Sequence, residues 1–168
     1  NNSKINLIPS GFHFSNATSP DQKSARFKLM WPEKSKILVV VGRLDPKKRQ
    51  DFVWDMFSTR NDEDEYLIFV GASTADEAPV FETALRSKIN AHPKGKRVLW
   101  AGFQDDMQAV YAAADLIIMP SAFETFGMAT LEALGTGCPV VGSNAGGTSE
   151  LLELYGGGLT FKKERQED

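Results

Sequence analysis

The sequence predicts an α/β fold, a Rossmann-like doubly wound parallel sheet, from three observations. Short apolar, β-branched runs end in turn residues, as at 37–41 before Gly42 and 116–119 before Pro120. Apolar residues in these runs are continuous rather than alternating, which is typical of strands buried on both faces. Segments with helical spacing fill the gaps, and a strand–helix repeat of about 25 residues indicates a parallel sheet with right-handed crossovers.

The expected elements alternate along the chain. We expect strands at 5–8, 37–41, 66–70, 97–101, 116–119, 139–141 and 159–161. We expect helices at 22–29, 51–58, 79–91, 105–113, 127–135 and 148–152. In the fourth of these helices, apolar residues repeat at the 3.6-residue period and Asp105 or Asp106 is the expected N-cap.

Length and composition bound the class of protein. The 168 residues fit one domain, 1–168, with 42% apolar and 24% charged residues, which is ordinary for a globular protein. A net charge of −3 gives no reason to expect nucleic acid as a partner. The single cysteine, Cys138, excludes an internal disulfide and fits a reducing compartment, so we expect a cytoplasmic protein.

A basic loop follows the strand expected at 37–41, at the strand end where parallel sheets bind ligands. It carries four cations within the seven positions 43–49, although the chain as a whole is acidic. Arg43 offers a planar fork and Lys48 a mobile point charge, which suit two oxygens of a diphosphate. A solvated basic turn has the same composition, so this loop alone leaves both interpretations open.

Two carboxylates, Glu124 and Glu132, lie eight positions apart around a helix expected to begin near Gly127. Free amides at a helix start attract phosphate, and carboxylates attract the hydroxyl pairs of sugars. A diphosphate on these amides would place a sugar toward Glu124 and a ribose toward Glu132. The alternative is that Glu132 is an exposed helix residue and Glu124 an acid favoured near the positive helix end.

Together these motifs resemble the large retaining glycosyltransferase family that includes glycogen synthase, sucrose synthase and bacterial mannosyl- and glucosyltransferases. Glu124 and Glu132 match the family's E-x7-E motif, and the match covers nearly the whole chain in order. The other matching residues are Gly42-Arg43-Leu44, Lys48, Gly102-Phe103, Tyr111, Ala114-Asp115, Pro120-Ser121, Gly137 to Val141, Gly146-Gly147 and Glu150.

The resemblance implies one half of a GT-B architecture, in which two Rossmann-like domains face each other across a cleft. This chain resembles the C-terminal half, which binds a nucleotide-sugar donor such as a UDP- or GDP-hexose. The acceptor, a glycan or lipid-linked molecule, would bind a separate N-terminal domain, and the family's closing helices would follow Asp168. We therefore expect the isolated domain to be inactive, and any membrane contact, peripheral at the inner face, to involve the other domain.

The resemblance also implies roles for individual residues. Arg43, Lys48 and Glu124 would be the catalytic residues, acting on the diphosphate and the donor sugar. The remaining donor-binding residues would be Gly42, Gly102, Phe103, Thr125, Phe126, Gly127, Met128 and Glu132. The family needs no cofactor and no essential metal. The acidic run 62–65 accordingly indicates a solvated turn rather than a set of metal ligands.

Three positions depart from the family pattern. Ser10 replaces a common Asn, Arg49 replaces a common Gly, and 72–74 replace an acidic-glycine pattern. Two other functions stay open: a non-catalytic nucleotide-binding module, and a nucleotide-sugar epimerase of similar architecture. A dehydrogenase is disfavoured because no G-x-G-x-x-G motif follows the strand at 37–41.

Overall fold

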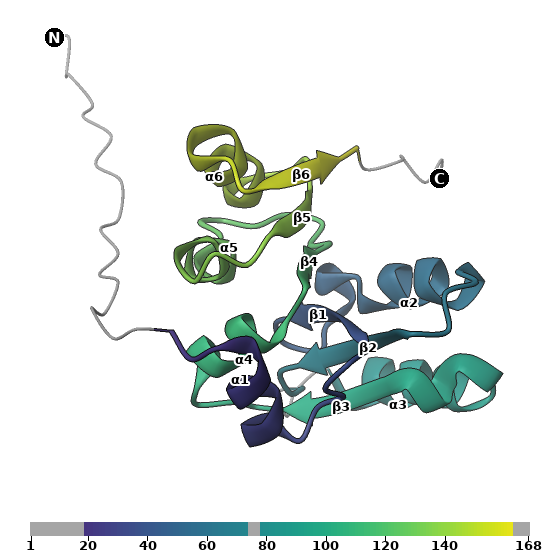
Figure 1. The fold of residues 1–168 in the computed structure, drawn as a ribbon. Helices are drawn as coiled ribbons and strands as arrows, with labels where there is room; N and C mark the ends of the chain where they lie inside the picture. Colours follow the sequence, from purple (N-terminus) through teal and green to yellow (C-terminus); the bar gives the residue numbers. More distant parts are fainter. Residues whose placement is uncertain (1–18, 74–77, 163–168) are drawn as a thin grey trace, which may run out of the picture.

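A computed structural model describes residues 19–73 and 78–162, and within them six parallel strands form one sheet (Figure 1). The strands are β1 (Lys36–Val41), β2 (Glu65–Val70), β3 (Val98–Gly102), β4 (Leu116–Met119), β5 (Val140–Ser143) and β6 (Gly158–Phe161). Their spatial order is β3-β2-β1-β4-β5-β6. The predicted Rossmann-like α/β class is confirmed, while the strand expected at 5–8 lies outside the described residues.

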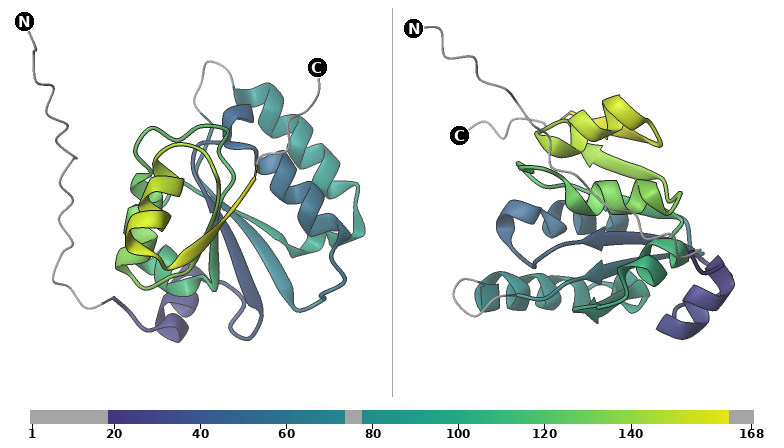
Figure 2. Two further views of the ribbon diagram at one scale, coloured as in Figure 1. Left: turned by 90° about the horizontal axis from the view of Figure 1, so that it is seen from above. Right: turned by 90° about the vertical axis from the view of Figure 1, so that its left-hand side faces the viewer.

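Helices cover both faces of the sheet. They are α1 (Gln22–Leu29), α2 (Gln50–Thr59), α3 (Ala78–Asn90), α4 (Met107–Ala113), α5 (Met128–Gly135) and α6 (Gly147–Tyr155). Figures 1 and 2 show α2 and α3 on one face and α1, α4, α5 and α6 on the other. Two short 3-10 helices, η1 (Pro46–Lys48) and η2 (Pro93–Arg97), were not expected from the sequence.

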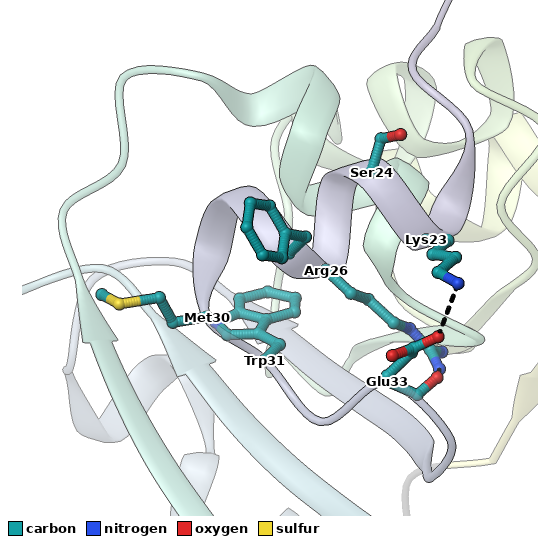
Figure 3. Close-up of a pocket in the computed structure, with 7 residues that line it drawn as sticks. Lys23, Ser24, Arg26, Met30, Trp31 and Glu33 are labelled. Carbon is teal, nitrogen blue, oxygen red and sulfur yellow. Dashed lines mark hydrogen bonds and ion pairs between the residues drawn. The ribbon is translucent and has the colours of Figure 1, made fainter.

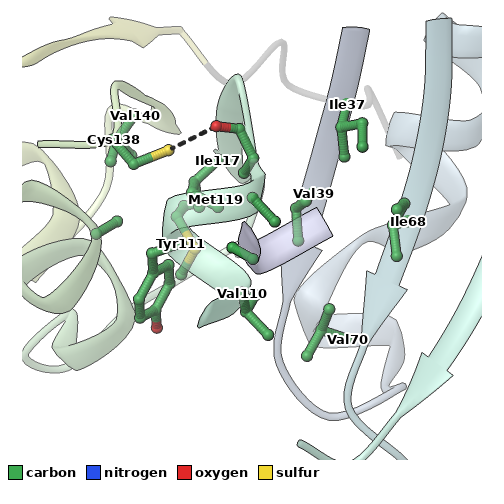
Figure 4. Close-up of a cluster of buried hydrophobic side chains, with 14 of the residues drawn as sticks. Ile37, Val39, Ile68, Val70, Val110, Tyr111, Ile117, Met119, Cys138 and Val140 are labelled. Carbon is green, nitrogen blue, oxygen red and sulfur yellow. Dashed lines mark hydrogen bonds between the residues drawn. The ribbon is translucent and has the colours of Figure 1, made fainter. Parts of the chain in front are cut away.

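The core has one apolar cluster on each side of the sheet. Side chains that alternate along β1 separate into the two clusters, with Val39 on the side of α4 and α5 and Val40 on the side of α2 and α3. Figure 4 shows the first cluster, in which Tyr111 and Cys138 pack beside the strand residues. Cys138 is a buried free thiol, as expected for a packing residue.

The chain changes direction across the sheet between β1 and β4. From β1 it continues toward β2 and β3 through α2, and from β4 it continues toward β5 and β6 through α5 on the other face. Adjacent strands whose connections diverge in this way form a topological switch point, outside which open α/β sheets bind their ligands. The loops after β1 and β4, at 42–49 and 120–127, lie at this point.

A buried arginine joins α1 to the opposite, amino-terminal edge of the sheet. Arg26 is 4% exposed, and its Nε donates to the Ala113 carbonyl at 2.9 Å. Its Nη2 lies 2.7 Å from Asp115 Oδ2, the same oxygen that accepts the backbone N–H of Ile37 at 2.6 Å. Asp115, part of the motif shared with the family, therefore braces α1, β1 and β4 at the edge remote from the switch point.

The acidic run 62–65 differs from the solvated turn that we expected. Asp62 pairs with Lys36 at 2.6 Å near the surface, but Glu65 is 2% exposed and begins β2. Arg60 donates twice to the Glu65 carboxylate, each time at 2.6 Å. The expectation is wrong for Glu65 because a bidentate guanidinium compensates its burial. Across the described ranges no group of three or more potential ligands could hold a metal ion.

In residues 19–73 and 78–162, no helix has the length and apolar character needed to span a bilayer.

Candidate nucleotide-sugar site

A salt bridge links the two loops at the switch point. Lys48 Nζ lies 2.7 Å from Glu124 Oε2, and the two side chains are 23% and 18% exposed. A backbone hydrogen bond of 2.9 Å from Ala122 N to the Lys47 carbonyl also joins these loops. The cation and the carboxylate that the sequence assigned to one ligand, 76 residues apart, are thus in direct contact.

The basic loop has a defined shape around Gly42. Gly42 has φ +145°, and a Cβ there would lie 3.6 Å from Lys48 Cδ, so the lysine stem passes over the glycine. Gln50, 1% exposed, donates its side-chain amide to the Arg43 carbonyl at 2.7 Å and holds the start of the loop against α2. The Arg43 side chain is 61% exposed, and its Nη2 is 3.6 Å from Asp45 Oδ2. Its guanidinium is therefore open to a ligand.

The backbone conformation of Arg49 explains why glycine is common at this position in the family pattern. Its φ is +52° and its ψ is 39°, the left-handed conformation that glycine adopts without strain. An L-residue in this conformation costs about 1–2 kcal/mol. The guanidinium lies 4.8 Å from the centre of the Phe52 ring, so the additional cation packs over α2.

The second glycine turn packs directly against the Glu124 segment. Gly147 N donates to the Glu124 carbonyl at 2.7 Å. A Cβ at Gly146 would come within 2.2 Å of that carbonyl oxygen, and one at Gly147 within 2.2 Å of the Phe126 carbonyl oxygen. Only glycine permits this approach. The turn at 146–147 and the segment 124–127 therefore form one structural unit.

In the part of the chain that the structure describes, three helices, α2, α5 and α6, which follow β1, β4 and β5, begin without the side-chain caps found on α1 and α4. Asp21 and Asp106 cap α1 and α4 with their carboxylates, and Asp106 confirms one of the two expected N-caps. Within the described residues, no side chain caps α2, α5 or α6. α5 begins at Met128, one residue after the position expected, with Gly127 as a left-handed N-cap. Its first amides have no side-chain cap and are therefore suited to an anion.

Glu132 is held by a residue that the sequence did not single out for this contact. The Tyr111 hydroxyl on α4 donates to Glu132 Oε2 on α5 at 2.6 Å. Tyr111 is 1% exposed, while Glu132 is half-buried. Burial, followed by the hydrogen bond to Glu132, raises the pKa of Tyr111 well above its usual value. The hydroxyl therefore stays protonated and acts as a donor.

The loop after β3 joins the same edge through a series of glycines. Gly102 has φ +65°, and its carbonyl accepts the Gly71 N–H at 2.7 Å. A Cβ at Gly71 would lie 2.1 Å from the Gly42 carbonyl oxygen. The loops after β1, β2 and β3 are therefore packed side by side. Phe103, one of the donor-binding residues that the resemblance implies, is 76% exposed.

The candidate residues divide into two groups by their contacts. Lys48 and Glu124 are in contact above Gly42, and Phe126 and Gly127 are fixed by the turn at 146–147. The others lie on adjoining parts of the same edge: Arg43, Gly102, Phe103, Thr125, Met128 and Glu132. No sequence signal marked Gln50 or the Tyr111–Glu132 bond, because both depend on partners brought together by the fold.

A separate open pocket of about 580 Å³ lies beside α1, at the amino-terminal edge of the sheet (Figure 3). Its lining is largely apolar and includes Phe27, Met30 and Trp31, with Lys23 and Glu33 paired at its rim. Arg26 contributes to its wall and bonds to the Ser35 carbonyl, which precedes β1. None of the candidate residues lines the pocket.

Comparison with known families agrees with this geometry. Residues 21–168 match the family described as glycosyl transferases group 1. The chain belongs to this family. The family assignment covers all six strands and both loops at the switch point, and it confirms the resemblance found in the sequence.

Named relatives include several glycosyltransferases. The chain is 34% identical over 122 residues to N-acetyl-alpha-D-glucosaminyl L-malate synthase of Bacillus anthracis, covering 72% of this chain and 30% of the relative. It is 31% identical over 144 residues to a GDP-mannose-dependent alpha-(1-6)-phosphatidylinositol dimannoside mannosyltransferase of Mycobacterium tuberculosis, covering 82% and 35% respectively. The chain thus spans about a third of the length of these relatives.

A solved structure shares both the fold and part of the sequence. HepE of Anabaena, determined in complex with UDP-glucose, superposes with a TM-score of 0.76 at 31% identity, over 87% of this chain and 40% of HepE. The GT-B-type domain fold is therefore shown for this chain.

Proposed function

We propose that this chain is the donor-binding domain of a retaining glycosyltransferase that uses a nucleoside-diphosphate hexose, with UDP or GDP as the nucleoside diphosphate. It would act in the cytoplasm with an acceptor-binding domain outside the chain, transferring the hexose to a glycan or lipid-linked acceptor. The observation that carries the proposal is the Lys48–Glu124 contact at the switch point. Complexes of HepE with UDP and with UDP-glucose support the choice of ligand.

The charges of the site suit a diphosphate. The exposed Arg43 guanidinium, the Lys48 ammonium and the uncapped start of α5 all offer positive charge or N–H donors. A phosphate oxygen would replace Glu124 as the partner of Lys48, and the released carboxylate would face the donor sugar. These cations would also stabilise the charge that grows on the departing diphosphate, so the proposed transfer needs no metal.

Calorimetric titration of the protein with UDP, GDP and ADP, and then with the corresponding sugar nucleotides, tests the proposal. We expect one nucleoside diphosphate to bind and Lys48→Met to weaken it. A hydrogen bond to a charged group contributes about 1.5–3 kcal/mol, so the loss should be about 10- to 150-fold. In Lys48→Met, the unpaired Glu124 carboxylate would also repel the phosphates. We therefore expect the loss of affinity to lie near the upper end of this range.

Lys47→Met is the matched control. It removes the same charge from the adjacent residue, whose side chain is exposed, and should change affinity less than about threefold because a screened surface charge contributes little. Equal effects of the two substitutions would show that Lys48 acts only through bulk charge. Absence of binding to all three nucleoside diphosphates would contradict the proposal itself.

The two alternative functions, a non-catalytic binding module and a nucleotide-sugar epimerase, can be distinguished by the products that form. A binding module gives tight binding but no transfer by the full-length protein to any acceptor. An epimerase converts the sugar nucleotide into its epimer without an acceptor, which chromatography of the nucleotide sugars detects.

A further inference from the structure

The ring of Tyr111 is buried in the core, while its hydroxyl forms a hydrogen bond to a carboxylate. The ring belongs to the apolar cluster beneath α4 and α5, and Figure 4 shows it at the margin of that cluster. Its hydroxyl donates to Glu132 Oε2 across the two helices at 2.6 Å. A phenylalanine ring would fill the same volume in the core. The contribution specific to tyrosine is therefore the hydrogen bond from its hydroxyl to the Glu132 carboxylate.

The bond fixes the carboxylate before any ligand arrives. A hydroxyl that donates to an ionised oxygen forms one of the stronger protein hydrogen bonds, and 2.6 Å lies within the range for such bonds. An unrestrained glutamate loses rotamer freedom when a ligand orders it, and this loss weakens binding. Because Tyr111 is itself held by close packing, Glu132 has already lost most of this freedom.

The position of the pair connects two parts of the proposed site. Tyr111 lies on the helix that follows the Gly102–Phe103 loop, and Glu132 lies in the second turn of α5, which begins four residues after Glu124. Tyr111 engages Oε2 from the protein side, so the carboxylate can receive a ligand hydroxyl from the half-exposed side. The ligand groups of matching chemistry beside a diphosphate are the vicinal hydroxyls of ribose.

We propose that Tyr111 is a positioning residue that orients the Glu132 carboxylate for the ribose hydroxyls, and thereby sets the preference for ribonucleotides over 2′-deoxyribonucleotides. This inference rests on the proposed function. Tyr111 does not touch the ligand and acts only through Glu132. Its hydroxyl strengthens ribose recognition and leaves phosphate recognition unchanged.

The test compares Tyr111→Phe with the unaltered protein by calorimetry. The ligands are the tightest-binding of UDP, GDP and ADP, its 2′-deoxy form and inorganic pyrophosphate. Ordering one side chain costs about 0.5–1.5 kcal/mol, so the ribonucleotide should bind about 2- to 13-fold more weakly. Affinity for the 2′-deoxynucleotide should fall less, which lowers the ribo/deoxy ratio, and pyrophosphate affinity should not change.

Two further variants separate positioning from disruption. Tyr155→Phe removes the same hydroxyl from a 64% exposed residue at the end of α6 and should leave all three affinities unchanged. In a Glu132→Ala background, Tyr111→Phe should have no further effect on the ribonucleotide.

Three results would overturn the inference: an unchanged ribo/deoxy ratio in Tyr111→Phe, an equal loss for pyrophosphate, or a full additional loss in the Glu132→Ala background. If the unaltered protein binds pyrophosphate but no nucleoside diphosphate, the proposed function fails first and this inference with it. The two failures are therefore distinguishable.

Discussion

Arg26→Met should strongly destabilise the fold, because it removes a buried guanidinium that bonds to four partners. The Arg26 side chain is 5% exposed and its guanidinium bonds to the carbonyls of Ala113, Glu33 and Ser35 and to the carboxylate of Asp115. Methionine retains most of the aliphatic stem and removes all four polar contacts. Asp115 would still accept from Ile37 N but would lose its counter-charge.

The expected loss of stability depends on the polar groups that Arg26→Met leaves without a partner. Removing one partner of a buried ion pair costs about 3–5 kcal/mol. Asp115 is 38% exposed, which reduces that cost, while the three carbonyls left without their donor increase it. We therefore expect the free energy of unfolding to fall by about 3–5 kcal/mol. For a domain of this size, about 2–4 °C per kcal/mol corresponds to a Tm lower by roughly 6–20 °C.

Urea unfolding followed by tryptophan fluorescence measures the change, with Lys23→Met as the matched control. Lys23 is on the same helix and pairs with Glu33 at 3.1 Å, but the two side chains are 76% and 57% exposed. The control should therefore change the free energy of unfolding by no more than about 0.5 kcal/mol. If Arg26→Met loses less than 1 kcal/mol, or no more than Lys23→Met, the guanidinium is not the brace described above.

Two other predictions concern the glycine turn and the thiol. Gly146→Ala should lower the free energy of unfolding by about 1–3 kcal/mol from backbone strain alone, and further because its Cβ would meet the Glu124 carbonyl. Gly137→Ala, also at positive φ but with open space around its Cβ, is the control, and equal urea midpoints for the two variants would refute the close-approach argument. Burial raises the pKa of Cys138 to about 12, against about 9 for an unburied thiol, so the folded state keeps a proton that the unfolded state loses. The free energy of unfolding should thus fall between pH 9 and 12 more steeply in the unaltered protein than in Cys138→Ala, and parallel pH profiles would contradict this.

The elements of the fold follow closely from local pattern. β4 has the expected bounds, and β1 and β2 each begin one residue early, because continuous apolar runs mark strands buried on both faces. β3 begins one residue late, at Val98, because η2 takes up Arg97. The strand order could not be read from the pattern, since it depends on which face each crossover helix covers.

The candidate site is predictable in its charges and only partly in its contacts. Lys48 and Glu124 were assigned to one ligand because both follow strands, and they meet. The approach of Gly146 to Glu124 and the bond from Tyr111 to Glu132 join segments about twenty residues apart. Nothing in local spacing specifies such contacts, which arise when the sheet brings α4, α5 and α6 together. The buried Glu65 was missed for a different reason: its partner Arg60 is only five residues away, but a run of acidic residues does not indicate that a guanidinium compensates the burial of one of them.

If the proposed function holds, the ion pair between the loops after β1 and β4 would influence which anions the site accepts. An arriving anion gains the lysine only by displacing a carboxylate 2.7 Å away, so the net gain is the difference between two ionic contacts. A small monovalent anion would gain little electrostatic energy by replacing the carboxylate as the partner of the lysine. A doubly charged pyrophosphate group, which the arginine could also contact, would gain more. Under the proposed function, this ion pair would disfavour binding of simple salt anions relative to a pyrophosphate group.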